Sequence, residues 1–297
     1  MRRLFALLVT LAATLALAPA ANAAATRVVA LEWDAVEGLS ALGVTPVGIA
    51  DARGYDAFVR APRLKGGEDV GLRQAPSLEK IRALRPDLIV VPDYRSTSNL
   101  AELRKIATVL VTTPYPAGGG NGAQFQAMVN DFRRIAAAVG KSGEGETVLR
   151  RMKQRFAAQK KALRKKRRHG AGVVIAEPGG TTSAPALRLM TNNSLAAEVV
   201  RRIGLRNAWG GRNTRFGFTT SGIGALAKVK SSQWLAFVYL EQYRTQIQKF
   251  RELPAFAKLP VVRARHYRNL ADKLWLYGGP ISTTQIADEV SRAIRRG

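Results

Sequence analysis

Aromatic and hydrogen-bonding side chains recur in this sequence at places where short apolar runs end. Trp33 ends the run RVVALEW, Tyr94 follows a run that ends at Pro92, and Arg73 follows a Gly-Leu pair. The other aromatic residues in loop positions are Tyr55, Phe58, Phe216, Phe218, Trp275 and Tyr277. Because ligands of open α/β sheets bind beyond the carboxyl ends of the strands, we expect side chains of this set to line one concave site. Aromatic walls with few polar anchors suit a bulky small molecule.

The residue types that catalysis requires are scarce. The two histidines, His169 and His266, both stand in basic segments, and we expect them at the surface or in structural roles. Neither an H-E-x-x-H nor a G-x-S-x-G motif occurs, and Gly118-Gly119-Gly120 lacks the spacing and the lysine of a phosphate loop. With two scattered histidines and no cysteine, we also expect no transition metal held by the protein itself. The sequence therefore predicts a binding protein rather than an enzyme.

The elements expected around these residues alternate between strand and helix. Residues 27–33, 34–43 and 45–51 read as strand, helix and strand, which at this length is a βαβ unit with parallel pairing. The alternation starts over after Gly170 with the strand GVVIAEP, and residues 215–222 are expected to form a loop. We therefore predict an α/β protein with two lobes, each built on a mainly parallel sheet.

One long helix is expected between the lobes, over residues 144–168. Leu149, Met152, Phe156 and Leu163 form a narrow apolar stripe on an otherwise basic cylinder. Such a helix is either a basic arm that binds nucleic acid or a rigid spacer. Because similar α/β patterns flank it, we interpret it as the spacer and expect no nucleic-acid partner. A spacer without a soft hinge predicts small movements of the lobes.

The first 23 residues have the pattern of a cleaved secretory signal. Arg2-Arg3 are followed by an apolar run from Leu4 to Ala18 and by the A-x-A site Ala21-Asn22-Ala23. We expect the mature chain in the periplasm. The predicted division is a signal peptide at 1–23, an N-terminal lobe at 24–140, an interlobe helix at 141–169 and a C-terminal lobe at 170–297.

The composition sets the charge and the redox chemistry of the chain. The 297 residues carry a formal charge of +26, and removal of Arg2 and Arg3 with the signal leaves +24. Anionic small molecules, a membrane surface, a permease or simply solvated basic faces are all compatible with this charge. Since the chain has no cysteine, disulfides cannot stabilise it, and two ordinary hydrophobic cores must do so.

Five blocks of the sequence resemble the periplasmic ferric-hydroxamate receptors of ABC importers, and more broadly the class III siderophore and cobalamin binders. The blocks are RVVALEW (27–33), ALGVTPVGIAD (41–51), DVGLRQAPSLEKIRALRPDLIVV (69–91), NSLAAEVVRRIGLRNAW (193–209) and LWLYGG (274–279). They keep their order and spread over nearly the whole mature chain. The resemblance implies a monomeric receptor that captures a ferric siderophore between two lobes and delivers it to an inner-membrane ABC permease. The iron would arrive already chelated, so no cofactor of the protein is implied.

The resemblance also implies roles for individual residues. Arg73 matches the arginine that hydrogen-bonds the iron-bound hydroxamate oxygens, and Tyr94 matches its tyrosine partner. The matching aromatic wall positions are Trp33, Phe58, Phe216, Trp275 and Tyr277. Phe58 and Phe216 stand where a ferrichrome receptor has tryptophans, and Leu276 stands where it has phenylalanine. Receptors of this family dock to the permease through an acidic residue on each lobe, for which Glu102 and either Glu252 or Glu241 are the expected positions.

Several ligands remain open at this point. Within the binding class these are ferric citrate, another anionic iron chelate, haem or cobalamin, because such binders share the strand and helix pattern. A secreted basic protein that binds polyanions through residues 150–168 is an alternative of a different class.

Overall fold

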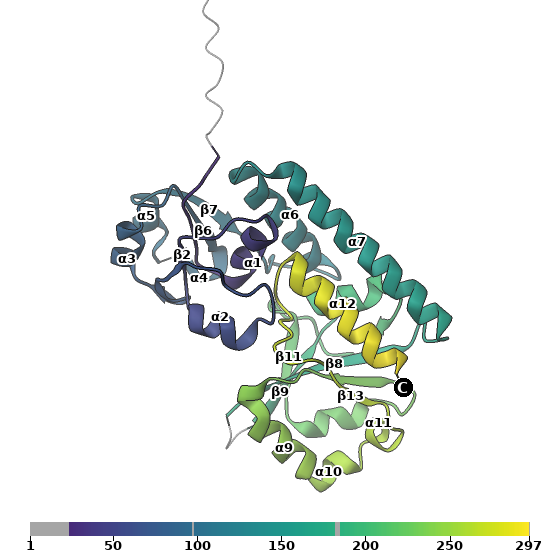
Figure 1. The fold of residues 1–297 in the computed structure, drawn as a ribbon. Coiled ribbons are helices and arrows are strands. Elements are labelled where there is room, and N and C mark those ends of the chain that lie inside the picture. Colours follow the sequence, from purple (N-terminus) through teal and green to yellow (C-terminus); the bar gives the residue numbers. More distant parts are fainter. Residues whose placement is uncertain (1–23, 97, 182–184, 297) are drawn as a thin grey trace, which may run out of the picture.

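The computed structural model describes residues 24–96, 98–181 and 185–296, which form two lobes joined by helices (Figure 1). The predicted signal peptide, residues 1–23, lies outside the described residues. In Figure 1 the N-terminal lobe is purple and blue, and the C-terminal lobe lies below it in green. The long helix α7 (Ser142–Lys165) runs along one side of both lobes. In the described part of the chain, no helix has the length and apolar character that a membrane span requires.

Five parallel strands form the sheet of the N-terminal lobe, in the order β3-β2-β1-β6-β7. Their bounds are Val28–Ala30 (β1), Gly48–Ile49 (β2), Glu68–Asp69 (β3), Leu88–Pro92 (β6) and Thr108–Thr112 (β7). The helices of this lobe are α1 (Trp33–Ala41), α2 (Ala52–Phe58), α3 (Leu78–Ala83), α4 (Asp93–Ser96), α5 (Leu100–Arg104) and α6 (Ala123–Ala138). The apolar strands β1 and β6 are buried along their whole length, as expected of central strands covered on both faces.

A small hairpin of the N-terminal lobe carries Arg73 at its tip. Strands β4 (Gly71–Leu72) and β5 (Ala75–Pro76) pair antiparallel, so Arg73 and Gln74 form the turn. Gly71 has a φ of 97°, a conformation that side chains with a Cβ rarely adopt. The Asp69 carboxylate accepts a hydrogen bond of 2.9 Å from the Gly71 N–H and fixes the start of the hairpin.

The sheet of the C-terminal lobe has six strands in the order β11-β9-β8-β12-β13, with β10 also paired to β8. Their bounds are Gly172–Gly180 (β8), Pro185–Met190 (β9), Arg206–Asn207 (β10), Phe218–Ser221 (β11), Trp234–Phe237 (β12) and Tyr267–Asn269 (β13). The helical segments are α8 (Leu195–Arg202), the 3-10 helices η1 (Ile223–Lys228) and η2 (Glu241–Tyr243), α9 (Arg244–Glu252), α10 (Pro254–Ala257), α11 (Pro260–Arg263) and α12 (Pro280–Arg295). The pairs β8–β9 and β9–β11 are antiparallel, whereas β8 pairs parallel with β10 and β12, and β12 with β13.

The predicted fold class, two α/β lobes with mainly parallel sheets and a joining helix, is confirmed. The loop expected over 215–222 is wrong in part, because Phe218–Ser221 forms strand β11. This edge strand is only partly buried and its FTTS sequence has no apolar alternation, so its β structure depends on pairing with β9.

The apolar stripe of α7 packs onto both lobes as the spacing predicts. Leu149, Met152, Phe156 and Leu163 are each at most 4% exposed. At about 1.5 Å per residue the helix is about 36 Å long, enough to reach along both lobes. It is not alone in this position, since the C-terminal helix α12 lies beside it (Figure 1).

Helix α12 contacts both the long helix α7 and the N-terminal lobe. The Asp288 carboxylate accepts hydrogen bonds of 2.6 Å from Arg155 and 2.7 Å from Gln159, both on α7. On another side, Glu289 pairs with Arg60 of the N-terminal lobe at 3.0 Å. We propose that the chain divides at residues 140 and 170 and that α12 belongs to the junction as well as to the C-terminal lobe.

A buried glutamate of the N-terminal lobe caps the start of α12. The fully buried Glu37, on α1, accepts hydrogen bonds from the Ser282 N–H (2.7 Å) and the Ser282 hydroxyl (2.6 Å). The N–H groups at a helix start have no partner within the helix, and the helix dipole favours an acceptor there. Burial raises the pKa of Glu37 from its ordinary 4.5 to about 7, although the hydrogen bonds from Ser282 act in the opposite direction.

This glutamate should make the stability of the protein depend on pH. A carboxyl group whose pKa is higher in the folded chain than in the unfolded chain stabilises the fold below the unfolded value, and this contribution is lost as the pH rises through the folded value. Between about pH 4.5 and 7 the loss is on the order of 3 kcal/mol, from about 1.4 kcal/mol per pKa unit.

We therefore expect the free energy of unfolding of the wild type to decrease by about 3 kcal/mol more than that of Glu37→Gln between pH 5 and 8. Glutamine keeps the shape of the neutral carboxyl group but does not titrate. Urea unfolding at several pH values measures the difference. Equal pH dependence in the two proteins would show that Glu37 does not titrate in this range.

Candidate ligand-binding site

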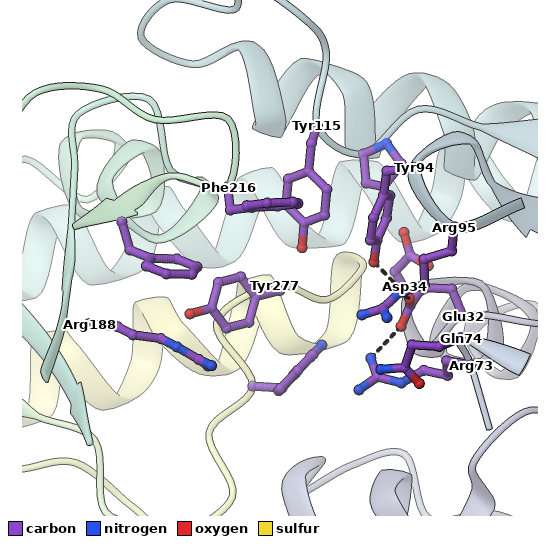
Figure 2. A pocket seen from close by; sticks show the side chains of 13 residues that line it. Glu32, Asp34, Arg73, Gln74, Tyr94, Arg95, Tyr115, Arg188, Phe216 and Tyr277 are labelled. Atoms are coloured by element: carbon purple, nitrogen blue, oxygen red, sulfur yellow. Dashed lines mark hydrogen bonds and ion pairs between the residues drawn. The ribbon is translucent and has the colours of Figure 1, made fainter. Parts of the chain in front are cut away.

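A cavity of about 580 Å³ lies between the two lobes (Figure 2). The N-terminal lobe contributes Glu32, Asp34, Arg73, Gln74, Tyr94, Arg95, Pro114 and Tyr115 to its lining. The C-terminal lobe contributes Arg188, Phe216, Phe218, Trp275 and Tyr277. One wall is therefore rich in charged groups and the other is mainly aromatic.

Three neighbouring parallel strands position the charged wall. Glu32 and Asp34 follow β1, Tyr94 and Arg95 follow β6, and Tyr115 follows β7. Because the carboxyl ends of parallel strands meet at one edge of the sheet, residues far apart in the sequence come together there. The hairpin β4–β5 adds Arg73 from the side.

A buried carboxylate organises this wall. Glu32 is 5% exposed and accepts hydrogen bonds from Arg73 Nη1 (2.6 Å), Arg95 Nε (2.9 Å) and the Tyr94 hydroxyl (2.7 Å). A buried carboxylate is costly without such partners, and here two guanidinium groups and a hydroxyl surround it. The three donors are thereby held in fixed positions beside the cavity.

Arg73 also contacts an aromatic ring and a second carboxylate. Its guanidinium carbon lies 3.4 Å from the ring centroid of Trp33, and its Nε lies 3.4 Å from a carboxylate oxygen of Asp51. The indole N–H of Trp33 is bonded in turn to the carbonyl oxygens of Ala50 and Asp51, at 3.2 Å each. A guanidinium has five N–H donors in one plane, so Arg73 can bond Glu32 and still offer donors to a ligand.

Burial shifts three other groups of this wall toward their protonated, neutral forms. Burial raises the pKa of the Asp34 carboxyl group well above its ordinary 3.8, and the neighbouring Glu32 raises it further. Burial likewise raises the pKa of Tyr94 and Tyr115 above the ordinary 10.0, so both hydroxyls keep their protons. The Tyr115 hydroxyl can therefore donate a hydrogen bond to an acceptor oxygen, whereas the single Tyr94 proton is already donated to Glu32.

The aromatic side chains form two groups around the cavity. Phe216 reaches from the C-terminal lobe to Tyr94 (6.0 Å between ring centroids) and Tyr115 (5.2 Å) of the N-terminal lobe. Trp275 contacts Tyr277 at 5.0 Å and also Trp33 at 5.0 Å. Edge-on contacts of this kind join the lobes and leave apolar ring surface toward a ligand.

The structure brings together five of the seven residues predicted for the ligand: Arg73, Tyr94, Phe216, Trp275 and Tyr277 all line the cavity. Trp33 and Phe58 lie behind its wall instead. Trp33 is 1% exposed, and Phe58 packs against both Trp33 (5.7 Å) and Trp275 (5.9 Å). Their contact with a ligand would be indirect, through Arg73 and Trp275.

Several charged residues of the site were not predicted from the sequence. Glu32 and Asp34 flank Trp33, and Arg95 follows Tyr94, so charged residues next to the strand ends were a usable signal. Arg188 and its partner Glu177 left no such signal, because their meeting depends on the antiparallel pairing of β8 and β9.

The acidic residues Glu102 and Glu252, expected to dock to a permease, are accessible. The Glu102 side chain, on α5, is 46% exposed and pairs with Lys105 at 2.7 Å. Glu252 is exposed at the end of α9. No group of three or more histidine, cysteine, aspartate or glutamate side chains in the described residues has the arrangement of a metal site.

Comparison with known proteins finds a matching family and several relatives of this chain. The family model described as "periplasmic binding protein" matches residues 28–274. The iron(3+)-hydroxamate-binding protein FhuD of Escherichia coli is 29% identical, over 90% of this chain and 86% of its own length. The Fe(3+)-citrate-binding protein YfmC of Bacillus subtilis is 27% identical, over 80% of this chain and 70% of its own.

A solved structure also aligns with nearly the whole chain. The siderophore-binding protein FhuD of Vibrio cholerae, crystallised with Fe3+ and Desferal, has a TM-score of 0.82 and 26% identity. The alignment covers 91% of this chain and 98% of the other.

Proposed function

This chain belongs to the periplasmic binding protein family, and from that premise we propose that it captures a ferric siderophore between its lobes as the substrate-binding component of an ABC importer. The family consists of binding proteins, and the chain is not an enzyme. The iron is cargo, carried inside the chelate.

The observation that carries this proposal is the fixed pair of Arg73 and Tyr94 opposite an aromatic wall. In a ferric chelate the oxygens that hold the iron keep partial negative charge on one surface, while the carrier that links them is largely apolar. Arg73 supplies free N–H donors for the oxygens, and the Tyr94 hydroxyl supplies one when it exchanges its hydrogen bond to Glu32 for one to the chelate. Phe216, Trp275 and Tyr277 supply ring surface for the carrier.

We propose a hydroxamate as the chelating group. Two relatives bind iron in this form according to their names, the hydroxamate receptor of E. coli and the Desferal-bound receptor of V. cholerae. Ferric citrate is the second candidate, because one relative is a ferric-citrate-binding protein and three arginines line the cavity.

We further propose that residues 1–23 direct export to the periplasm and are then cleaved. The mature chain would act there as a monomer. The accessible Glu102 and Glu252 are the proposed contacts to the permease, one on each lobe. Acidic residues in exposed positions can pair with basic residues of a membrane partner at little desolvation cost.

A titration panel tests the ligand class. We expect saturable quenching of tryptophan fluorescence by a ferric trihydroxamate, because Trp275 lines the cavity and Trp33 lies directly behind it. Ferric citrate, a ferric catecholate, haem and cobalamin serve as the comparison ligands. Tightest binding of one of those four would replace hydroxamate as the ligand class.

The same titration repeated at several salt concentrations separates the receptor from a polyanion-binding protein. Binding in a cavity through fixed hydrogen bonds should change little with salt. Binding of a polyanion to the basic face of α7 should fall steeply, because it releases counterions. Salt-sensitive binding of polyanions without binding of any ferric chelate would overturn the proposed function.

A further inference from the structure

The C-terminal wall of the cavity repeats the polar arrangement of the N-terminal wall. Glu177 lies toward the carboxyl end of β8, the first strand of its lobe, as Glu32 follows β1, the first strand of the other lobe. Its side chain is 2% exposed and accepts hydrogen bonds from Tyr277 (2.7 Å) and Arg188 Nη1 (3.3 Å). Each lobe thus has one buried glutamate that holds a tyrosine and arginine at the cavity, two arginines in the N-terminal lobe and one in the C-terminal lobe.

The strand pairing explains why Arg188 has a defined position. Glu177 and Arg188 are direct partners across the antiparallel strands β8 and β9. The Arg188 guanidinium carbon also lies 5.1 Å from the ring centroid of Phe218 on β11, the strand that pairs with β9 on its other side. A carboxylate on one side and a ring on the other hold the guanidinium, as Glu32 and Trp33 hold Arg73.

Figure 2 shows Arg188 and Tyr277 across the cavity from Arg73 and Arg95. The Arg188 side chain is 41% exposed, so it is accessible from the cavity although its partner Glu177 is buried. Iron(III) bound by three bidentate ligands has oxygens on all sides, and an anchor on one wall can reach only those that face it. An arginine on the opposite wall can reach the others.

We propose that Arg188, held by Glu177, forms a second anchor that binds acceptor oxygens on the C-terminal side of the ferric chelate, while Tyr277 holds Glu177 in place by donating its own hydrogen bond to it. This inference rests on the proposed function and extends it to a specificity-determining residue. The site would bind a chelate by charged hydrogen bonds from both lobes, rather than by one polar wall and one purely apolar wall.

The arrangement also limits the charge of the ligand. The three arginines that line the cavity are balanced in large part by the buried carboxylates of Glu32 and Glu177. A ferric trihydroxamate is neutral, since three singly charged ligands offset Fe(III), whereas a ferric triscatecholate carries three negative charges. With three guanidinium groups and two carboxylates the cavity keeps a net charge of about +1, so it attracts a triply charged complex far less than three unpaired arginines would.

Replacing Arg188 by glutamine tests the anchor. We expect the affinity for a ferric trihydroxamate such as ferrioxamine B to fall about tenfold, as the loss of one charged hydrogen bond would cause. The matched control is Arg263→Gln, because Arg263 is exposed on α11 and lies outside the cavity lining. Circular dichroism and thermal unfolding confirm that both variants are folded before titration.

Replacing Glu177 by glutamine tests the charge selection, with a measurement that a purely structural role would not change. Glutamine can still hold Tyr277 and Arg188 by hydrogen bonds but removes the negative charge. We expect the ratio of the affinity for a ferric triscatecholate to that for ferrioxamine B to rise at least about fivefold at low salt. A loss of local structure alone would lower both affinities together.

The outcomes separate this inference from the function on which it rests. If the wild type binds no ferric chelate, the proposed function fails. If the wild type binds ferrioxamine B and Arg188→Gln binds it within twofold of the Arg263→Gln control, the second anchor is overturned. An unchanged ratio in Glu177→Gln, or no detectable binding of the catecholate by this variant, overturns the charge selection.

Discussion

Replacing Arg73 by alanine is expected to weaken binding of a ferric trihydroxamate by about 10- to 150-fold, or about 1.5 to 3 kcal/mol. Arg73 is 13% exposed at its side chain and is fixed by Glu32 and by the face of Trp33. Its remaining donors are therefore oriented before the ligand arrives, so little conformational entropy is lost on binding. Isothermal titration calorimetry of wild type and variant measures the difference.

Two further variants make this result specific. Arg73→Lys keeps the charge but not the planar fork of donors, so we expect an affinity between those of the wild type and the alanine variant. Arg82→Ala, an exposed arginine on the neighbouring helix α3, is the control and should bind like the wild type. Affinity of Arg73→Ala within twofold of that control would exclude Arg73 as the main anchor.

Replacing Trp33 by alanine is expected to lower the free energy of unfolding by about 3 to 5 kcal/mol. Trp33 is 1% exposed and contacts Tyr55, Phe58 and Trp275. Its indole N–H donates a hydrogen bond to a backbone carbonyl oxygen within the lobe. Its removal would leave a cavity in the core and would also take away the ring beneath Arg73. Urea unfolding measures the loss of stability, and a chelate titration measures the accompanying loss of affinity.

Trp275→Ala is the matched control for Trp33→Ala. Trp275 is only partly buried and lines the cavity, so we expect a smaller loss of stability from its removal than from the removal of Trp33. We therefore expect Trp33 to contribute more to stability, and Trp275 to contribute more to direct contact with the ligand. Equal losses of stability would contradict the placement of Trp33 behind the wall.

The two tryptophans show which features of the site could be predicted from the sequence and which could not. Position after a strand predicted that Trp33 lines the ligand site, whereas the structure places it behind the cavity wall, because this position leaves the direction of the side chain open. In the structure Trp33 is the first residue of α1 and packs inward, while its neighbour Glu32 points to the arginines of the cavity. Burial of one large ring against others settles the direction, and that is a tertiary effect.

Residues with local signals were predictable, and residues that depend on long-range pairing were not. Arg73 could be assigned because it stands in a block that resembles a known family, and Tyr94 because it follows the end of that block by three residues. The long helix could be predicted from its own apolar spacing. Glu177 and Arg188 meet only because β8 and β9 pair antiparallel, and strand β11 exists only against β9. The apolar periodicity of one strand does not predict which other strand it pairs with.

The central claim is that a ferric chelate binds in the cavity between the lobes, and the position of the iron tests it most directly. Crystals grown with ferrioxamine B would show iron by its anomalous scattering. We expect one iron site per chain inside the cavity, with chelate oxygens within hydrogen-bonding distance of Arg73 and Tyr94. Iron found only outside this cavity, or a cavity without iron in crystals saturated with the chelate, would contradict the claim.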